Sequence, residues 1–344
     1  MSEQVRAAIS QVMRGGSLST ADAHAAMASV MDGEATQAQL AGLLLALRMR
    51  GETVDELTGF AMAMRERVLA VAAPEGAIDT CGTGGDGSST FNISTAAALV
   101  VAAAGVPVAK HGNRAVTSAS GSADVLEALG IRVDLGPADA ADALRRDGFA
   151  FLFAPAYHPA MRHAGPVRRE LGTPTAFNLL GPMTNPAGVR RQVIGVADPT
   201  AAAKVANVLH RLGAERALVV HGDGVDELPL DGSGVIYDVS RLGVRRRRVD
   251  SADLGLMRAD SAELRGGDAA RNAEIIESVL DGAHGAARDV VLLNAGAALV
   301  AAGRARRLRD GVGIAATTID SGKTRALLAR LRERHEPRAA ESAA

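Results

Sequence analysis

Hydrophobic positions recur at helical spacing throughout the first 72 residues of the chain. Two capping-box patterns each open such a segment, Ser19-x-x-Asp22 and Thr53-x-x-Glu56. The segment 39–49 is apolar on more than one face, so it needs cover from neighbouring helices or from another subunit. The pattern therefore predicts a small helical domain at 1–72, and we expect this domain to form a homodimer.

From residue 78 onward, short runs of β-branched and other apolar residues alternate with alanine-rich segments at helical spacing. The runs predict strands at 105–109, 131–133, 150–153, 193–196 and 217–220. The segments between them predict helices at 123–129, 138–147 and 200–212. Strands that alternate with helices are typical of a mostly parallel sheet with right-handed crossovers and flanking helices. We therefore predict an α/β fold for a large domain at 73–344.

The carboxyl-terminal half departs from this alternation in two places. Residues 155–186 form a helical stretch punctuated by proline and glycine, and residues 234–250 alternate as an exposed strand pair does. Helices are expected at 268–280, 288–301 and 322–334, and the last residues, 337–344, are expected to be disordered.

Composition disfavours nucleic-acid binding. Aromatic residues make up 2% of the 344 residues, tryptophan is absent, and the formal net charge is −1. Proteins that bind single strands stack bases on aromatic side chains, and proteins that bind duplexes carry a basic excess. The four arginines at 245–248 are therefore interpreted as part of a solvated strand.

Cysteine usage and hydropathy favour a soluble protein of the cytoplasm. The one cysteine, Cys81, cannot form an internal disulfide and suits a reducing compartment. No apolar run reaches the length of a membrane span without a polar interruption, and no basic stretch followed by an apolar core is present at the first residues.

A glycine-rich stretch at 79–95 is the strongest functional signal. Four glycines in six positions, followed by serines and threonines, let backbone N–H groups and hydroxyls turn toward one anion. The apolar segment 96–104 would place the N-terminus of a helix at the same anion. A second polar loop, 110–118, follows the next strand. Because loops after parallel strands meet at one edge of a sheet, the two loops predict a phosphate site.

Several motifs resemble those of the anthranilate phosphoribosyltransferases of tryptophan biosynthesis. Three of them lie in the two loops: Gly82-Thr83-Gly84-Gly85-Asp86, Asn92-Ile93-Ser94-Thr95 and Lys110-His111-Gly112-Asn113-Arg114. Others follow in the same order downstream, among them Phe177-Asn178-Leu179-Leu180-Gly181-Pro182, Asp226-Glu227 and Asn294-Ala295-Gly296. The resemblance covers nearly the whole chain. It implies transfer of a phosphoribosyl group from 5-phosphoribosyl diphosphate (PRPP) to the amine of anthranilate, with release of pyrophosphate.

The resemblance also implies the site residues. It implies that part of 155–186 joins the small helical domain and that the cleft lies between this domain and the large domain. The residues implied for PRPP are Gly82, Gly84, Gly85, Asp86, Thr90, Asn92, Ile93, Ser94, Thr95, Lys110, Gly112, Asn113, Arg114, Thr117, Ser118 and Ser122. Those implied for anthranilate are Gly82, Asn113, Arg168, His111 and Tyr157. Two Mg²⁺ ions are implied, with the protein ligands Ser94, Asp226 and Glu227.

The chemistry of the reaction agrees with these residue types. Departing pyrophosphate must be neutralised, which backbone N–H donors, a lysine and an oxygen-bound divalent metal can do. The amine of anthranilate is neutral and nucleophilic at pH 7, so no strong general base is needed. His111 is therefore interpreted as a donor to the anthranilate carboxylate, and His158 as a structural residue at the start of a helix. Cys81 has no evident histidine partner and is assigned no nucleophilic role.

Two departures from the family pattern leave the acceptor side open. The chain reads Thr173-Pro174-Thr175 where Ile-Arg-Thr is usual, and Leu228-Pro229-Leu230 follows the acidic pair. One alternative is a pyrimidine nucleoside phosphorylase, which shares the fold and a glycine-rich loop, although the acidic pair favours a metal-bound diphosphate. Another is a non-catalytic paralogue that binds single-stranded nucleic acid on a basic dimer face, which the charge and the scarcity of aromatics disfavour.

Overall fold

The computed structural model describes residues 1–85, 87–115, 119–222 and 224–333. Several sequence-based predictions lie outside the described residues. They are the PRPP contacts Asp86, Thr117 and Ser118, the last residue of the predicted helix 322–334, and the segment 337–344.

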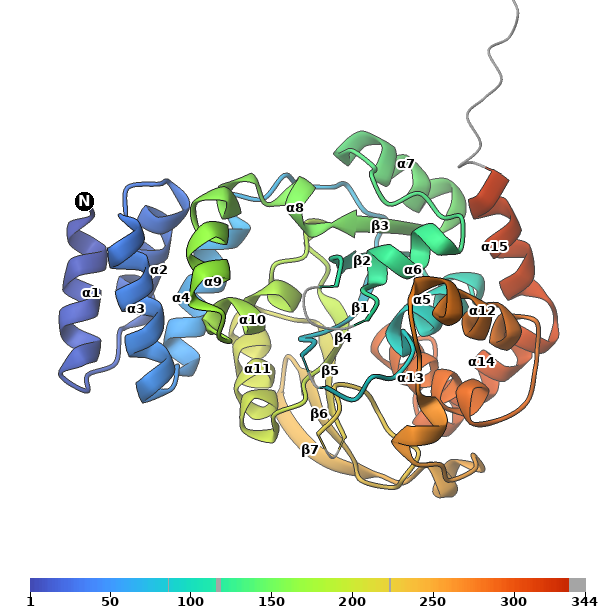
Figure 1. Ribbon diagram of the computed structural model, residues 1–344. Coiled ribbons are helices and arrows are strands. Elements are labelled where there is room, and N and C mark those ends of the chain that lie inside the picture. The colour runs from blue at the N-terminus through green and yellow to red at the C-terminus, as the bar shows by residue number, and fades with distance from the viewer. Residues whose placement is uncertain (86, 116–118, 223, 334–344) are drawn as a thin grey trace, which may run out of the picture.

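Seven strands form one sheet in the order β3-β2-β1-β4-β5-β6-β7 (Figure 1). Their bounds are β1 (Ile78–Gly82), β2 (Val108–Gly112), β3 (Phe149–Phe153), β4 (Arg191–Gly195), β5 (Arg216–His221), β6 (Gly234–Ser240) and β7 (Gly243–Val249). The first five strands pair in parallel, and β6 and β7 are antiparallel. The mostly parallel α/β sheet and the strand pair predicted at 234–250 are thus confirmed.

Helices cover both faces of the sheet, and the pleat decides which core each strand residue joins. On β4, Val193 packs with the helices α5 and α13, whereas the next residue, Ile194, packs with α11 and the amino-terminal helices. The helices of the large domain are α5 (Ile93–Ala103), α6 (Ser122–Ala128), α7 (Pro137–Asp147), α8 (Ala154–Tyr157), α11 (Pro199–Arg211), α12 (Ala269–Leu280), α13 (Ala286–Ala301), α14 (Leu308–Asp320) and α15 (Lys323–Glu333).

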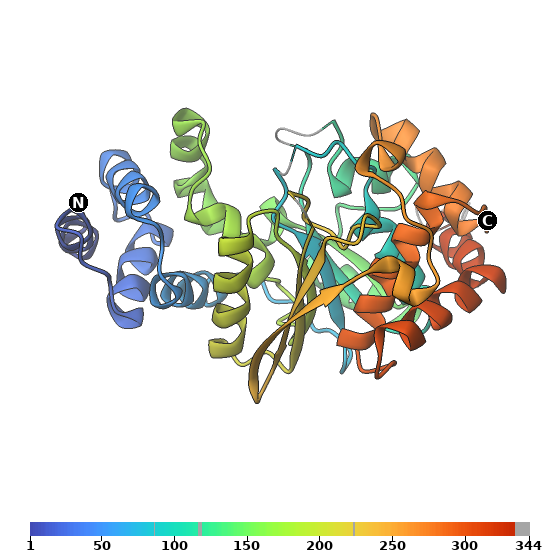
Figure 2. The same ribbon diagram turned by 90° about the horizontal axis from the view of Figure 1, so that it is seen from below.

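Four amino-terminal helices stand to one side of the sheet, and α9 and α10 lie between them and it (Figures 1 and 2). Their bounds are α1 (Glu3–Met13), α2 (Thr20–Met31), α3 (Gln37–Arg50), α4 (Val54–Arg65), α9 (Gly165–Leu171) and α10 (Ala176–Leu180). Thr53 and Glu56 form the predicted capping box, and the Ser19 side chain accepts a hydrogen bond from the Asp22 N–H. One hydrophobic cluster joins these six helices to α11, so the segment 155–186 does pack against the amino-terminal helices.

Some elements differ from the sequence-based prediction. The strand predicted at 105–109 is β2, which spans Val108–Gly112. Residues 131–133 form no strand: Ile131 and Val133 are buried in the core beside α6, but no strand pairs with them. The helix α14 was not predicted, because glycines at 311 and 313 interrupt its pattern. Gly311 has a packing reason, since a Cβ there would lie 2.4 Å from the Gly296 carbonyl oxygen of α13.

The strand β7 is the last in the sheet order, and it carries the arginine run. The side chains at 245–248 are all exposed, and Arg247 donates a hydrogen bond to the carboxylate of Asp238 on β6 at 2.8 Å. Within the part of the chain that the structure describes, no helix is long and apolar enough to cross a membrane.

Candidate active site

The two predicted loops follow β1 and β2, which are neighbours in the sheet, so both begin at the same sheet edge. The glycine-rich loop needs left-handed backbone: φ is 66° at Gly84 and 72° at Gly85, where a side chain would be strained. The side chain of Asn92 donates to the Ser120 carbonyl oxygen at 3.2 Å and so connects the first loop to the second. The convergence predicted from the sequence is therefore present in the structure.

The acidic pair after β5 reaches both ends of the glycine-rich segment. Asp226 Oδ2 accepts a hydrogen bond from the Gly84 N–H at 2.8 Å, and Glu227 Oε1 accepts one from the Ser94 N–H at 3.0 Å. Ser94 lies in the first turn of α5, where free N–H groups and the helix dipole favour a carboxylate. Adjacent carboxylates thus bind separate segments of one loop, and the three residues predicted as metal ligands come together.

Two glycines leave space for Asp226. A Cβ on Gly82 would lie 2.2 Å from Asp226 Oδ2, and a Cβ on Gly195, at the end of β4, would lie 1.5 Å from the Asp226 carbonyl oxygen. Gly195 was not predicted as a site residue. A signal for it exists in the sequence, because a glycine directly after the β-branched pair 193–194 indicates close approach of another backbone segment.

The donor atoms at this position suit Mg²⁺. The two carboxylates and the Ser94 hydroxyl are hard oxygen ligands, and Mg²⁺ needs few protein ligands because it retains water and binds substrate phosphates. Among the described residues there is no group of three or more histidine, cysteine or acidic side chains that could hold a metal ion.

Lys110 lies beneath the loop and not at its surface. Its side chain is 1% exposed, and Nζ donates to the Thr80 carbonyl oxygen at 2.5 Å and approaches the Ser94 Oγ at 3.4 Å. Burial lowers the pKa of Lys110, and the nearby Asp79 carboxylate opposes this shift. The sequence pattern predicts Lys110 in the polar loop 110–118; this is corrected, because Lys110 is a buried cation on β2, under the Ser94 turn.

Asp79 is the buried counter-charge of Lys110. Its two carboxylate oxygens accept hydrogen bonds from the His111 N–H at 3.1 Å and from Asn185 Nδ2 at 2.8 Å. Burial raises the pKa of Asp79 to about 6, whereas Lys110 and these hydrogen bonds lower it. Asp79 and Asn185 were not predicted as site residues; both are buried, and they meet only through the tertiary fold.

The second loop is closed at its base by Asp124. Its Oδ2 accepts hydrogen bonds from the N–H groups of Ala115 and Gly121, both at 2.9 Å. Arg114, a predicted PRPP contact, binds the carboxylates of Asp124 and Glu127 on α6 through its guanidinium group. In this structure the charge of Arg114 is therefore compensated within the loop and α6.

The other predicted PRPP residues differ in exposure. Ile93 and Thr95 are buried, at 2% and 0% exposure, so their side chains do not face the cleft. The remaining described residues lie along the two loops with partial or full exposure, namely Gly82, Gly84, Gly85, Thr90, Asn92, Ser94, Gly112, Asn113, Arg114 and Ser122. A small cavity of about 60 Å³ adjoins Thr90, Ile93 and Glu227.

His111 has both ring nitrogens occupied by protein groups. Nδ1 lies 3.2 Å from the Gly181 carbonyl oxygen, and Nε2 lies 3.2 Å from Nε2 of His158. A carbonyl oxygen only accepts, so Nδ1 of His111 carries the proton. A neutral His111 therefore has no N–H left to donate to the anthranilate carboxylate in this structure, and His158 packs against its Nε2 and is not only a helix-start residue.

Tyr157 does not line the site. Its side chain is 0% exposed in the cluster with Leu144 and Leu152, and its hydroxyl donates to the Leu135 carbonyl oxygen at 2.7 Å. The predicted contact between Tyr157 and anthranilate is corrected on this ground.

Arg168 and its neighbour Arg169 differ in exposure. Arg168 is partly buried, with its guanidinium carbon 5.2 Å from the centre of the Phe177 ring, and burial lowers its pKa. Arg169 is exposed. A desolvated guanidinium stacked on an aromatic ring is suited to a planar carboxylate partner.

The buried histidine pair predicts that stability rises with pH. Burial lowers the pKa of His111 to about 3 and that of His158 to about 4, so the unfolded chain binds protons below about pH 6.5 that the folded chain does not. Stability is therefore lost as the pH falls from about 6.5 toward 4, and the raised pKa of Asp79 opposes part of this loss between about pH 4 and 6.

His158→Gln removes one of these titrations and leaves the others. When the pH is lowered from 6 to 5, the free energy of unfolding of this variant should fall by about 1 kcal/mol less than that of the unchanged chain. Urea unfolding at the two pH values measures the difference, and an identical pH dependence in both proteins would contradict the assignment.

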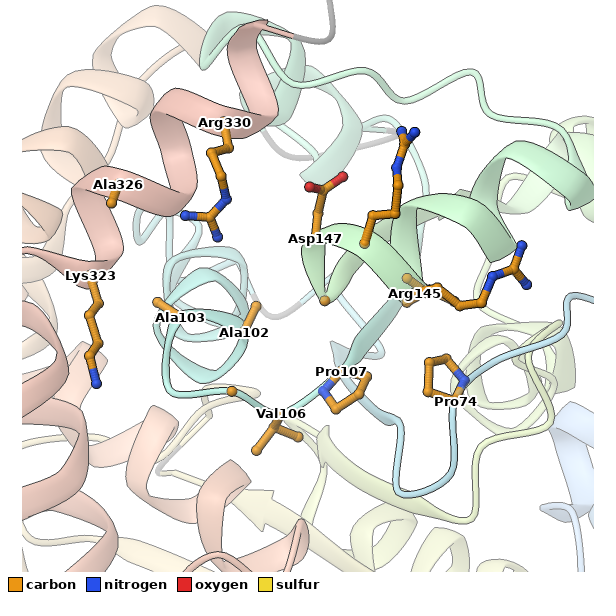
Figure 3. Close-up of a pocket in the computed structure, with 14 residues that line it drawn as sticks. Pro74, Ala102, Ala103, Val106, Pro107, Arg145, Asp147, Lys323, Ala326 and Arg330 are labelled. Atoms are coloured by element: carbon orange, nitrogen blue, oxygen red, sulfur yellow. The ribbon is translucent and has the colours of Figure 1, made fainter.

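A separate cavity lies at the opposite edge of the sheet (Figure 3). Its volume is about 440 Å³, and its lining includes Pro74, Pro107 and Gly148, which directly precede or approach the amino ends of β1, β2 and β3. Figure 3 shows two of its cationic side chains, Lys323 and Arg145, pointing away from each other. None of the predicted site residues lines this cavity, so it is not the candidate active site.

The helical bundle and the sheet with its glycine-rich loop and acidic pair match the two domains of a glycosyltransferase family. Residues 74–325 match the family model described as the glycosyl transferase family, a/b domain. Residues 6–68 match the helical bundle domain of the glycosyl transferase family.

Within this class, the chain belongs to the anthranilate phosphoribosyltransferases. It is 54% identical over 341 residues to the anthranilate phosphoribosyltransferase of Symbiobacterium thermophilum, covering 98% of this chain and 100% of that protein. The crystal structure of the enzyme from Thermus thermophilus is similar with a TM-score of 0.90 and 44% identity, over 96% and 99% of the two chains. The enzyme from Saccharomyces cerevisiae in complex with PRPP and Mg has a TM-score of 0.88 and 25% identity, over 97% and 98%.

Proposed function

We propose that this chain transfers the phosphoribosyl group of PRPP to the amine of anthranilate, as a step of tryptophan biosynthesis, at the edge where β1, β2 and β5 end. The observation that carries the proposal is the anchoring of Asp226 and Glu227 by the N–H groups of Gly84 and Ser94. These hydrogen bonds hold two carboxylates beside the glycine-rich loop. Carboxylates can bind a divalent metal and the loop can bind phosphate, so together they suit a metal-bound diphosphate.

Ser94, Asp226 and Glu227 would hold two Mg²⁺ ions, and the bound ions supply positive charge that stabilises the departing pyrophosphate. Around them, the backbone of the glycine-rich loop and the side chains of Asn92 and Asn113 would bind the phosphoribosyl and diphosphate groups. Lys110 contributes from below through the Ser94 hydroxyl. The bond from the anomeric carbon to the pyrophosphate oxygen breaks, the bond to the amine nitrogen forms, and that nitrogen releases a proton to water.

His111 is not assigned as the base of this reaction. Both of its ring nitrogens are engaged, by Gly181 and by His158, and its pKa is lowered to about 3 by burial. The neutral amine of anthranilate needs no such base. The acceptor side is instead assigned to Arg168 as the partner of the carboxylate, together with Gly82 and Asn113.

Replacing Glu227 by glutamine should raise the Mg²⁺ requirement. The amide keeps an oxygen that can accept from the Ser94 N–H but removes the charge that attracts the ion. We expect kcat/KM for PRPP to fall by about two powers of ten at a fixed low Mg²⁺ concentration, and to recover in part when Mg²⁺ is raised. Initial rates across a Mg²⁺ titration measure this. A rate loss that is the same at every Mg²⁺ concentration would refute a metal role for Glu227.

Arg168→Ala should separate the two substrates. A charge-assisted hydrogen bond contributes about 1.5–3 kcal/mol, so the KM for anthranilate should rise by one to two powers of ten while the KM for PRPP hardly moves. Arg169→Ala is the matched control, because its side chain is exposed on the same helix. If the KM for PRPP rises as much as that for anthranilate, Arg168 supports the cleft or the phosphoribosyl site and not the acceptor.

The helical domain supports the proposal of a homodimer. Its described surface exposes several large apolar side chains, among them Met13 at 75% and Met49 at 89%. Exposed apolar side chains gathered on one small domain favour association. Light scattering of the full chain tests this, and a monomer at micromolar concentration would overturn it.

A cytoplasmic location is proposed on the one free cysteine, Cys81, and would be tested by fractionation.

A further inference from the structure

A series of three hydrogen bonds crosses the candidate site and includes Asn272, a residue that no motif of the sequence indicated. The N–H of Gly267 donates to Oδ1 of Asn272 at 2.8 Å, and Nδ2 of Asn272 donates to Oδ1 of Asn92 at 2.9 Å. Nδ2 of Asn92 in turn donates to the Ser120 carbonyl oxygen at 3.2 Å. Asn92 and Asn272 are 180 positions apart in the sequence.

The donor and acceptor roles along this series of hydrogen bonds are fixed by the backbone groups at its two ends. A backbone N–H can only donate, so Asn272 must present its oxygen to Gly267 and its NH₂ group to Asn92. A carbonyl oxygen can only accept, so Asn92 must present its NH₂ group to Ser120 and its oxygen to Asn272. Turning either amide over would place two donors or two acceptors against each other, which is costly where the groups are buried.

Asn272 is held firmly enough to impose this orientation. It lies in the first turn of α12, is 2% exposed, and its own N–H donates to the Asp268 carbonyl oxygen at 3.0 Å. The preceding segment is bonded along the glycine-rich loop: the Phe91 N–H donates to the Leu264 carbonyl oxygen at 3.0 Å and the Gly266 N–H donates to that of Ser89 at 2.9 Å. The start of α12 and the loop are therefore one connected unit.

We propose that Asn272 is a positioning residue for PRPP binding, acting through the orientation of the Asn92 side chain. The inference rests on the proposed function, in which Asn92 binds PRPP. An amide NH₂ group carries two hydrogens, and Ser120 takes one of them, so the other is available to an anion between the two loops. Asn272 keeps this donor in place by holding the oxygen of the same amide.

A double-mutant cycle between Asn92 and Asn272 tests the proposal. Asn272→Ala alone should lower kcat/KM for PRPP by about tenfold, with the KM for anthranilate changed less than about twofold. In a chain that already carries Asn92→Ala, adding Asn272→Ala should cause almost no further loss, because no amide remains to be oriented. Arg271→Ala is the control, since that side chain is exposed on the same turn of α12.

Asn272→Asp provides a second variant that preserves the shape of the side chain. An ionised carboxylate still accepts from Gly267 but has no hydrogen for Asn92, so the PRPP effect should persist and should again vanish beside Asn92→Ala. Thermal unfolding of each variant shows that the rates refer to folded protein.

Two results would overturn the proposal: equal losses from Asn272→Ala with and without Asn92, or equal effects on both substrates. Either would make Asn272 a support of α12 alone. If the unchanged chain fails to turn over PRPP and anthranilate at all, the proposed function fails, and this outcome is distinguishable from both.

Discussion

Gly195→Ala is expected to remove almost all activity while leaving the chain folded. A Cβ at the end of β4 would lie 1.5 Å from the carbonyl oxygen of Asp226, so the backbone that carries the acidic pair must move by well over an ångström. A displacement of about 1 Å at a catalytic group can cost about a hundredfold in rate. We expect a loss of at least that size in kcat, together with a higher Mg²⁺ requirement.

Gly313→Ala is the matched control for this substitution. Gly313 lies in α14, and a Cβ there would meet no atom within 4 Å. Alanine favours a helix over glycine by roughly 1 kcal/mol, so this variant should be fully active and slightly more stable. Circular dichroism of both variants checks that they fold. Substantial activity in the Gly195 variant would mean that the acidic pair need not occupy its observed position.

Lys110→Met is expected to destabilise the fold by about 3–5 kcal/mol, since it leaves the buried Asp79 carboxylate without its cation. Methionine matches the length of the lysine side chain, so the effect comes from the charge and from the lost hydrogen bond to Thr80. The midpoint of urea unfolding measures the change. Replacing Lys110 therefore affects stability as well as any role in binding.

A double variant separates the charge from the packing. Adding Asp79→Asn to Lys110→Met removes the second charge, and part of the lost stability should return because no unpaired ion stays buried. Lys323→Met, at the start of α15 and away from the site, should leave the free energy of unfolding within about 0.5 kcal/mol of the unchanged chain. Equal midpoints for Lys110→Met and the unchanged chain would show that Asp79 is protonated or solvated in the fold.

Most of the fold could be predicted from the sequence because the local patterns agree with the tertiary packing. The apolar runs at 150–153 and 217–220 are strands of the sheet, and the pattern at 234–250 gives β6 and β7. The run at 131–133 looks the same in the sequence, yet its apolar side chains are buried by α6 and the core without strand partners. Hydrophobic periodicity indicates which residues are buried, but it does not show which neighbouring element buries them.

The site could be predicted only where the residues belong to its loops. The loops and the acidic pair can be recognised in the sequence as polar segments that follow apolar strands. The sequence does not show which side of the sheet each of their residues faces. Lys110 and His111 are adjacent on β2, so the pleat sends them to opposite faces: Lys110 lies with Val108 on the α5 side, and His111 lies with Ala109. Asn272 depends on a contact between distant segments, which no local pattern reports.

The arginines of β7 also limit how the molecule can aggregate. A terminal strand with free N–H and C=O groups is a template for another sheet, and proteins often protect such strands with charge. Two copies that met edge to edge along β7 would bring the exposed side chains at 245–248 of one chain against those of the other. Like charges opposite each other disfavour the pairing. Growth of a continuous intermolecular sheet, the first step toward a fibre, is therefore opposed at this edge.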